Sequence, residues 1–277
     1  GCIDIDSVYF EVNMVNPTIE AGLNQTICIG DSVVLSATYP TGTQMSWNNG
    51  VQNNQYFLPL VSQYYTLSVI ATNGCQSQDS LFVQVNQLPA IYAGPDIEIC
   101  SGQAVSLAGS FGTIYYWTGG IQNAVPFIPT STGAYTVTGV DVNGCQNSDL
   151  VMVTVHPNPT VNAGTDPSIC LGDSVLLAAS GALTYSWSNG MSNGSYVTPN
   201  FNTLLEVTGT NQFGCSGSDL FDISVNQPSN STINVVFQGP YTLNGVTYNV
   251  SGTYTQIIPN AAGCDSTITL NYELIDV

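Results

Sequence analysis

Residues 27–35 read Ile-Cys-Ile-Gly-Asp-Ser-Val-Val-Leu, and the chain repeats this pattern twice more. The copies are Ile-Cys-Ser-Gly-Gln-Ala-Val-Ser-Leu at residues 99–107 and Ile-Cys-Leu-Gly-Asp-Ser-Val-Leu-Leu at residues 169–177. Self-similarity at a fixed period of about 70 residues indicates one small module repeated in series. The module, rather than any single motif, therefore decides the fold.

The module predicts several short β-strands and no helix. In the first copy, alternating apolar residues indicate strands at 33–37, 65–71 and 81–85, separated by turns rich in glycine and asparagine. Every copy also has a tryptophan that closes another strand before a glycine turn: Trp47, Trp117 and Trp187. Short strands at regular spacing and the order Cys, Trp, Cys predict an all-β protein of tandem small immunoglobulin-like (Ig-like) β-sandwiches.

The predicted boundaries fall at proline residues that follow the last strand of each copy. They give Ig-like repeats at 17–88, 89–158 and 159–227, and a shorter divergent β repeat at 228–277. Residues 1–16 match the end of a repeat, so we expect them to be the terminal strand of a preceding or partner repeat. Because the linkers are short and contain proline, we expect the array to form a stiff rod.

The charge of the chain is extreme, since 18 acidic residues with no lysine and no arginine give a net charge of −18. Salt bridges with lysine or arginine are excluded, so cohesion must come from apolar burial and disulfides. A hydrophobic content of 43% argues against intrinsic disorder. Nucleic-acid binding is excluded as a function because it rests on basic side chains that neutralise phosphate.

No stretch approaches the roughly 18 consecutive apolar residues of a membrane-spanning helix, which argues against membrane insertion. The chain opens without a basic and apolar signal segment and has no site for trypsin-like proteases. We therefore expect a mature or excised piece that resists proteases outside the cell. The alternative is that the chain is the stretch between two cleavage points after lysine or arginine in a longer protein.

Six of the eight cysteines form three pairs separated by about 45 residues, one pair in each Ig-like repeat. Even numbers at regular spacing, with no histidine or Cys-x-x-Cys pattern beside them, predict disulfides instead of a zinc site. The predicted disulfides lie within repeats: Cys28–Cys75, Cys100–Cys145 and Cys170–Cys215. Each would restrict the unfolded chain by about 4 kcal/mol, which matters for a module too small to bury much surface.

Cys2 and Cys264 are left without a partner in this scheme. Three interpretations stay open for them. They are free buried thiols, or Cys2 pairs with a segment upstream, or they link consecutive subunits.

The sequence offers no catalytic site. His156 is the only histidine and lies between repeats, where a solvated linker residue is expected. No lysine or arginine is present to hold a phosphate or an oxyanion, so no enzymatic activity is predicted. We predict no cofactor and no defined metal site. The carboxylates would screen diffuse counterions or bind Ca²⁺ weakly, although no calcium-loop pattern occurs.

A set of short motifs recurs in each Ig-like repeat. In the first repeat they are Ala21-Gly22 to Leu35, Ser46 to Gly50, Tyr65 to Val69, Asn73-Gly74-Cys75 and Ser80 to Val85. In combination they resemble the Ig-like, PKD-like repeats of large secreted surface proteins of Bacteroidota. The fourth repeat resembles a second repeat type of those proteins, with Leu243 where the family usually has tryptophan. The resemblance covers essentially the whole chain and implies export by the type IX pathway and roles as adhesins, gliding-associated surface proteins or extracellular fibres.

The resemblance also implies O-glycosylation, because members of this phylum often modify serine or threonine between an aspartate and an apolar or threonine residue. Five serines match this pattern: Ser7, Ser32, Ser80, Ser174 and Ser266. Asp-Ser pairs also make turns before strands, so the pattern has an equally good structural explanation.

The predicted function is structural, as a subunit of an extracellular cell-surface filament or as the stalk of a surface adhesin. In a filament, residues 1–16 would complete a sheet of a neighbouring subunit by β-strand addition, with Val8, Phe10 and Val12 on one face. The expected partners are copies of the chain or neighbouring repeats of a longer chain, with surface glycans as further candidates. The alternative function is a carbohydrate-binding repeat array attached to a secreted hydrolase.

Overall fold

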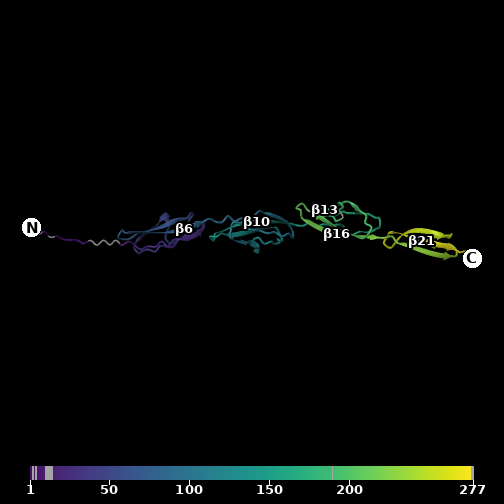
Figure 1. The fold of residues 1–277 in the computed structure, drawn as a ribbon, viewed down its shortest axis with the longest axis horizontal. Helices are drawn as coiled ribbons and strands as arrows, with labels where there is room; N and C mark the ends of the chain where they lie inside the picture. The colour runs from purple at the N-terminus through teal and green to yellow at the C-terminus, as the bar shows by residue number, and fades with distance from the viewer. Residues whose placement is uncertain (2, 4, 10–14, 189, 276–277) are drawn as a thin grey trace. The chain divides into compact units, whose positions relative to one another are not determined.

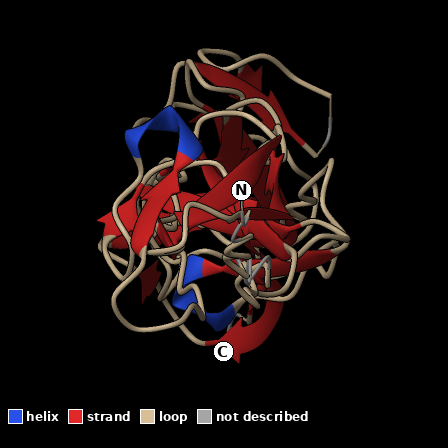
Figure 2. Ribbon diagram, turned by 90° about the vertical axis from the view of Figure 1, so that its left-hand side faces the viewer, coloured by secondary structure: helices blue, strands red, loops and turns tan. Residues whose placement is uncertain are grey.

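The computed structural model covers residues 1–277 and describes all of them except residues 2, 4, 10–14, 189 and 276–277. Its strands, drawn red in Figure 2, and its small sheets confirm the prediction of an all-β chain of Ig-like sandwiches. The helical elements of the described residues are two 3-10 turns, η1 (Asn48–Gly50) and η2 (Thr118–Gly120). Each directly follows a tryptophan, at the glycine turns that the sequence indicates.

We name the predicted ranges repeat 1 (17–88), repeat 2 (89–158), repeat 3 (159–227) and repeat 4 (228–277). Each sheet draws all its strands from one of these ranges, and Figure 1 labels the long strands β6, β10, β16 and β21. By their internal contacts, the residues group into two compact units. One unit is Gly1–Glu98 with Ala104–Thr154, and the other is Ile99–Gln103 with Val155–Val277.

Repeat 1 has a four-stranded sheet in the order β1-β6-β5-β3 and a small sheet of β2 and β4. The strands are β1 (Gln25–Cys28), β2 (Val33–Val34), β3 (Gln44–Trp47), β4 (Tyr56–Phe57), β5 (Gln63–Ile70) and β6 (Gln76–Asn86). The strand expected at 33–37 is shorter than predicted, and β1 is an element that the alternation of apolar residues did not indicate.

The core of repeat 1 follows from alternation along its strands. Tyr65, Leu67 and Val83 are fully or almost fully buried and pack with Leu35 in one apolar cluster. Trp47 joins this cluster, and its indole nitrogen donates a hydrogen bond to the Asn53 side-chain oxygen at 3.3 Å. The repeat is thus held by apolar packing around a tryptophan whose polar atom is satisfied.

Repeats 2 and 3 use the same arrangement of strands. Repeat 2 has the sheet order β7-β10-β9-β8, and repeat 3 has the order β11-β16-β15-β13 with a small sheet of β12 and β14. The strands of repeat 2 are β7 (Ile97–Cys100), β8 (Ile114–Trp117), β9 (Gly133–Val140) and β10 (Gln146–His156). Those of repeat 3 are β11 (Ser168–Cys170), β12 (Val175–Leu176), β13 (Thr184–Trp187), β14 (Tyr196–Val197), β15 (Thr203–Thr210) and β16 (Ser216–Asn226).

Repeat 4 is smaller, and its described residues form one strand fewer in the main sheet. Its main sheet has the order β17-β21-β20, and β18 pairs with β19. The strands are β17 (Asn230–Phe237), β18 (Tyr241–Leu243), β19 (Val246–Tyr248), β20 (Gly252–Pro259) and β21 (Asp265–Leu274). In the described part of the chain, no strand lies beside β20 in the place that β13 occupies beside β15.

In repeats 1 and 3, the first strand of the large sheet runs parallel to the last one. In repeat 1, Gln25 of β1 lies opposite Val83 of β6, and Cys28 lies opposite Asn86. In repeat 3, Cys170 of β11 lies opposite Asn226 of β16. The cysteine that ends each of these short strands therefore lies at the end of the repeat where the chain leaves it.

Candidate functional site at the disulfides between repeats

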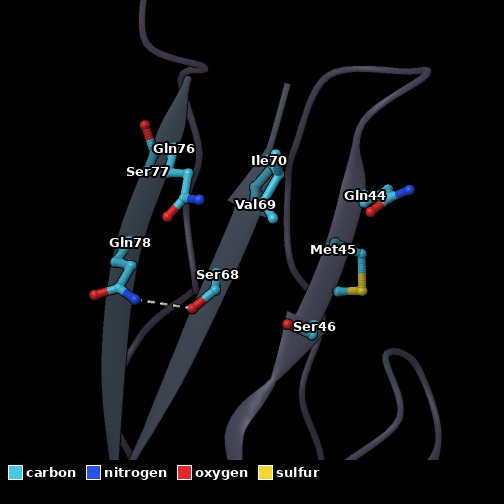
Figure 3. A pocket seen from close by; sticks show the side chains of 9 residues that line it. All are labelled: Gln44, Met45, Ser46, Ser68, Val69, Ile70, Gln76, Ser77 and Gln78. Atoms are coloured by element: carbon cyan, nitrogen blue, oxygen red, sulfur yellow. Dashed lines mark hydrogen bonds between the residues drawn. The ribbon is translucent and has the colours of Figure 1, made fainter. Parts of the chain in front are cut away.

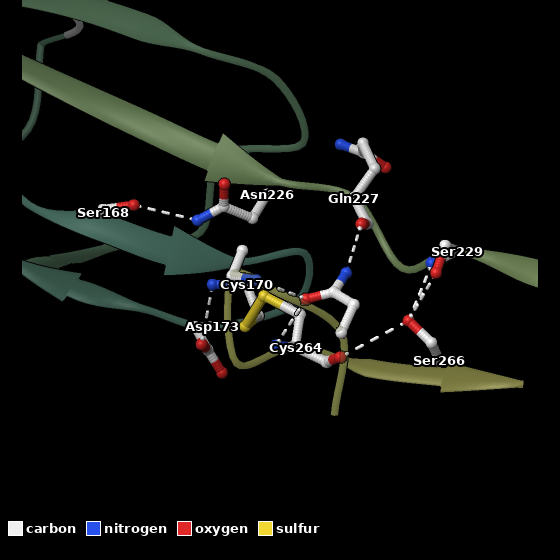
Figure 4. Close-up of a disulfide and its surroundings, with 10 residues drawn as sticks. Ser168, Cys170, Asp173, Asn226, Gln227, Ser229, Cys264 and Ser266 are labelled. Atoms are coloured by element: carbon white, nitrogen blue, oxygen red, sulfur yellow. Dashed lines mark hydrogen bonds between the residues drawn. A yellow bond between two sulfur atoms is a disulfide. The ribbon is translucent and has the colours of Figure 1, made fainter. Parts of the chain in front are cut away.

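Among the described residues, three disulfides each join one repeat to the next. They are Cys28–Cys145, Cys100–Cys215 and Cys170–Cys264. In each bond, the first cysteine ends the first short strand of one repeat's large sheet, and the second lies in the turn before the last strand of the following repeat. Figure 4 shows the bond between repeats 3 and 4.

The predicted pairing within repeats is wrong. Cys28 lies beside Asn86 at the end of β6, whereas Cys75 directly precedes Gln76 at the start of that strand. The 11 residues of β6 span about 35 Å, and the two Cα atoms of a disulfide must lie roughly 4.4–6.8 Å apart. Cys28 and Cys75 are thus at opposite ends of their repeat, and the same holds for Cys170 and Cys215.

The first cysteine of each bond is fixed by a tight turn that follows it. The Cys28 and Cys170 amides donate to the carboxylates of Asp31 (3.1 Å) and Asp173 (3.0 Å), and the Cys100 amide donates to the Gln103 side chain (2.9 Å). The residue after each cysteine continues the strand pairing, as when the Leu171 amide donates to the Asn226 carbonyl at 3.0 Å (Figure 4 labels Asn226).

The second cysteine lies in an equally well defined turn. The side-chain oxygens of Asp141, Asn211 and Asn260 accept the amides of Cys145, Cys215 and Cys264 at 2.8, 3.0 and 3.0 Å. The glycine before each cysteine has a positive φ of about 80°, a conformation that favours glycine. Both halves of each disulfide are therefore held by their own repeat.

The remaining cysteines differ from the predictions. Cys75 was expected in a disulfide but is a free, half-buried thiol. Cys264 was expected to be unpaired or linked to another subunit, and it is bonded to Cys170 instead. Cys2 lies outside the described residues.

The turn at Cys75 has the same backbone pattern as the three bonded turns. The Ala71 amide donates to the Cys75 carbonyl at 2.9 Å, just as the Asp141 amide donates to the Cys145 carbonyl at 2.9 Å. Ala71 has no side-chain acceptor, so the Asn73 side chain accepts the Cys75 amide at 3.0 Å. The turn thus forms without its disulfide.

A carboxylate ties the entry of each Ig-like repeat to its last strand. The side chains of Asp79, Asp149 and Asp219 accept the amides of Ala21, Ala93 and Ala163 at 2.7, 2.9 and 2.8 Å. The backbone N–H groups of Ala93 and Leu150 lower the pKa of the Asp149 carboxyl below its ordinary value, and desolvation opposes them. This role was missed, although aspartate stands at the same distance after the second cysteine in every copy.

One asparagine in each Ig-like repeat accepts a hydrogen bond from the buried tryptophan. The side-chain oxygens of Asn53, Asn123 and Asn193 accept the indole N–H of Trp47, Trp117 and Trp187 at 3.3, 3.0 and 3.3 Å. The same oxygens accept a backbone amide of the facing segment, as from Ala179 at 2.7 Å. The constant spacing from tryptophan to asparagine in all three copies is the signal that would have found this pair.

The proposed glycosylation sites fall in two groups. Ser7, Ser32, Ser80 and Ser174 are exposed. Ser266 is 5% exposed and accepts the backbone amide and the hydroxyl of Ser229 at 3.0 and 2.9 Å, so the folded repeat 4 does not present it (Figure 4).

Of the residues proposed for strand addition, Val8 is 70% exposed, while Phe10 and Val12 lie outside the described residues. His156 is not a solvated linker residue, because it ends β10 and stacks on Phe213 with ring centroids 3.8 Å apart. The described residues contain no group of three or more His, Cys, Asp or Glu that could hold a metal ion. No helix among them is long and apolar enough to cross a membrane.

A shallow groove of about 280 Å³ lies across β3, β5 and β6 of repeat 1 (Figure 3). The residues that line it are Gln44, Met45, Ser46, Ser68, Val69, Ile70, Gln76, Ser77 and Gln78. Gln78 donates to the Ser68 hydroxyl at 3.1 Å within it. With no acid, histidine or cysteine in its lining, the groove offers polar contacts but no general acid or base.

No protein-family model matches the chain, and no curated protein matches it. Solved structures that match are chains of tandem Ig domains. Titin domains I67–I69 match with a TM-score of 0.41 and 13% identity over 77% of this chain and 99% of that one. Sidekick-1 Ig domains 1–4 match at 0.29 and 13% over 76% of each chain, and Drosophila OTK extracellular domains 3–5 match at 0.29 and 12% over 77% and 98%. At these values the matches are no evidence on function.

Proposed function

We propose that the protein is a load-bearing structural protein outside the cell, either a subunit of a cell-surface filament or the stalk of a surface adhesin. The observation that carries this proposal is that the three disulfides of the described residues all join consecutive repeats. A disulfide that only stabilised one fold would lie inside one repeat, whereas these bonds couple repeats to each other. Such bonds persist in oxidising surroundings, which supports an extracellular location. Export by the type IX pathway of a Bacteroidota cell follows from the sequence resemblance and belongs to the same proposal.

In the filament form, the subunits would join by β-strand addition through residues 1–16. The described apolar side chains of this segment are strongly exposed, with Ile3 at 88%, Ile5 at 84% and Tyr9 at 93%, and no strand is assigned to its described residues. Exposed apolar side chains on a segment whose described residues form no strand support pairing with another subunit. Strand addition uses backbone hydrogen bonds, so it suits a chain without lysine or arginine.

Repeat 4 offers an acceptor for such a strand. The hairpin β20–β21 corresponds to β15–β16, but the edge of β20 has no counterpart of β13 among the described strands. β20 is eight residues long, whereas β13 has four, and long unprotected edges invite another strand. The proposed contact therefore joins the start of one copy to repeat 4 of the next.

Cys75 provides a second connection in the proposal. It occupies the same kind of turn as Cys145, Cys215 and Cys264, each of which is bonded to a cysteine that ends the first short strand of a repeat. We expect Cys75 to bond the equivalent cysteine of another Ig-like repeat, in a longer chain or a neighbouring subunit. Non-reducing peptide mapping of native material tests this, because an unmodified Cys75 thiol there would contradict it.

Surface glycans on Ser7, Ser32, Ser80 and Ser174 also remain part of the proposal. The carboxylates of Asp31 and Asp173 accept cysteine amides, so these aspartates form turns whether or not the serines carry sugars. Mass spectra of native peptides decide the question, and unmodified Ser32 and Ser174 would end the glycan hypothesis.

The proposed function is tested by electron microscopy of native cell surfaces and by assembly of variants. Uniform fibres labelled by an antibody to the chain would support the filament, and beaded strings on larger molecules would support the stalk. For the filament, Val8→Asp should abolish polymer while the protein stays folded. Ser7→Asp, on the opposite face of the proposed added strand, should leave assembly unchanged. Polysaccharide binding without a surface structure would favour the carbohydrate-binding array instead.

A further inference from the structure

The disulfides create a covalent route through the protein that is much shorter than the chain. Cys28 is bonded to Cys145, and Cys170 is bonded to Cys264. Between Cys145 and Cys170, the route follows only the chain of residues 145–170, which contains β10 and β11. Residues 29–144 and 171–263 are therefore closed loops beside this route.

From this connectivity we propose that the protein limits its own extension: under tension, its length is capped by the disulfide route even when its repeats unfold. The inference rests on the proposed load-bearing function for its biological use, but the cap itself is a property of the purified chain. The cap would act when a pulling force is applied at the two ends of the chain.

The size of the cap follows from the length of an extended backbone. From Cys145 to Cys170 there are about 25 peptide steps, and with two disulfides of 5.5 Å between Cα atoms the route reaches about 95 Å. The unbridged chain from Cys28 to Cys264 would reach about 800 Å. Unfolding of the repeats therefore cannot release most of the chain.

The strand on this route is placed to carry load. β10 is already extended over Gln146–His156 and lies inside its sheet, between β7 and β9. Its cysteine end is held by the Asp141 side chain, which accepts the Cys145 amide at 2.8 Å. At the other end, the Asp173 carboxylate and the pairing of β11 with β16 hold Cys170. Tension therefore passes along β10 and β11, whose backbone is already extended and can lengthen only a little.

Cys100–Cys215 lies off this shortest route, which gives the proposal a sharp internal control. Removing it leaves the route of residues 145–170 intact. If Cys28–Cys145 is removed instead, the shortest route from Cys28 runs to Cys100, through Cys215 back to Cys170, and on to Cys264. That route contains about 117 peptide steps and reaches about 410 Å. The middle disulfide is therefore a second safeguard that acts only after the first bond has opened.

The test is single-molecule stretching of the oxidised full chain between tags at its two termini. The contour length between Cys28 and Cys264 should stop at about 95 Å, and reduction should lengthen the molecule by roughly 700 Å. The double variant Cys100→Ala, Cys215→Ala should keep the oxidised limit. The double variant Cys28→Ala, Cys145→Ala should lengthen it by roughly 310 Å.

Two results would overturn the inference. A limit near 350 Å in the oxidised protein would mean bonds within repeats, since that pairing leaves about 99 peptide steps between Cys28 and Cys264. A limit that moves when Cys100 and Cys215 are replaced would mean that the middle bond bears the load. Non-reducing peptide maps at acid pH accompany each measurement and identify the bonds in the stretched material. If the limit holds but microscopy finds no surface structure, the proposed function fails and the inference stands.

Discussion

Repeats 3 and 4 are built on the same antiparallel hairpin, β15–β16 in one and β20–β21 in the other, paired in the same register relative to Cys215 and Cys264. Around it, repeat 3 packs a cluster of ten buried residues that includes Trp187. The corresponding cluster of repeat 4 contains three: Tyr248, Leu270 and Tyr272. Both repeats present a Cys-bearing turn, but repeat 4 has no cysteine that ends a first strand. Repeat 4 thus takes part in one of the described disulfides, whereas repeat 3 takes part in two, and we expect the small core of repeat 4 to depend more on its bond.

The largest expected effect is on repeat 4 when its disulfide is removed. Cys170–Cys264 closes a loop of 94 residues, which restricts the unfolded chain by about 4–5 kcal/mol in the loop-entropy model. In the double variant Cys170→Ala, Cys264→Ala, we expect repeat 4 to lose its protection against hydrogen exchange while repeat 3 keeps most of its own. Exchange followed by peptic digestion and mass spectrometry resolves the two repeats.

The matched control for this change is the double variant Cys28→Ala, Cys145→Ala. These residues lie in the other compact unit, so repeat 4 should exchange as in the unmodified protein. Equal protection of repeat 4 with and without its own disulfide would contradict the dependence drawn from its small core.

A second large effect is expected from single core truncations at equivalent positions. Leu270 and Phe221 stand at the same distance after Cys264 and Cys215, and they are 1% and 4% exposed. Leu270→Ala and Phe221→Ala should each cost about 3–4 kcal/mol, since both leave a cavity. Repeat 4 should unfold after its truncation, because little core remains, while repeat 3 should stay folded with a lower midpoint. Urea titrations monitored by methyl NMR signals of each repeat would measure this, and a folded Leu270→Ala repeat 4 would refute it.

The same comparison shows what the sequence could predict. The hairpins of repeats 1–3 were predictable, because residues such as Leu205 and Val207 alternate with polar neighbours and the turns contain glycine. The short strand that carries Cys28 was not, since Gln25–Cys28 is four residues long and its pairing with β6 is a long-range, parallel contact. The strand predicted at 33–37 is too long because it was read from local alternation, whereas β2 pairs with β4 only at Val33 and Val34.

The disulfide pairing failed for a physical reason of the same kind. In a periodic chain, the spacing from Cys100 to Cys145 within a repeat and the offset from Cys100 to Cys215 in the next are both regular. Spacing alone therefore cannot choose between them. The choice is made by the direction of the first strand, which places its cysteine at the exit of the repeat, and that direction is a property of the sheet.

A smaller effect is expected from the tryptophan and asparagine pair that repeat 4 lacks. In repeat 3, the Asn193 oxygen accepts the Trp187 indole and the Ala179 amide, and its nitrogen donates to the Ala179 carbonyl at 3.1 Å. Asn193→Ala leaves these groups unsatisfied in a half-buried site and should cost about 2 kcal/mol. Asn193→Asp keeps the acceptor and should cost less. Fluorescence of Trp187 during urea unfolding, in a background with Trp47→Phe and Trp117→Phe, provides the measurement, and equal losses for both variants would argue against the acceptor role.

The smallest expected effect is on stability at low pH. It distinguishes repeat 2 from repeat 4, because a different side chain accepts the backbone amide near the start of each repeat. In repeat 2 that group is the Asp149 carboxylate, whose pKa is lowered by the Ala93 and Leu150 N–H groups. In repeat 4 it is the Ser266 hydroxyl, which accepts the Ser229 amide and does not titrate in this range.

Because the folded pKa of Asp149 lies below the unfolded one, its contribution to stability is present above about pH 4 and is lost as the pH falls through the folded value. We therefore expect Asp149→Asn to lower the midpoint of repeat 2 at about pH 6 and to have less effect at about pH 2. Ser266→Ala should lower the midpoint of repeat 4 equally at both pH values. Thermal unfolding followed by NMR signals of each repeat would show this, and an Asp149→Asn effect that does not change with pH would mean that the carboxylate stabilises repeat 2 by shape alone.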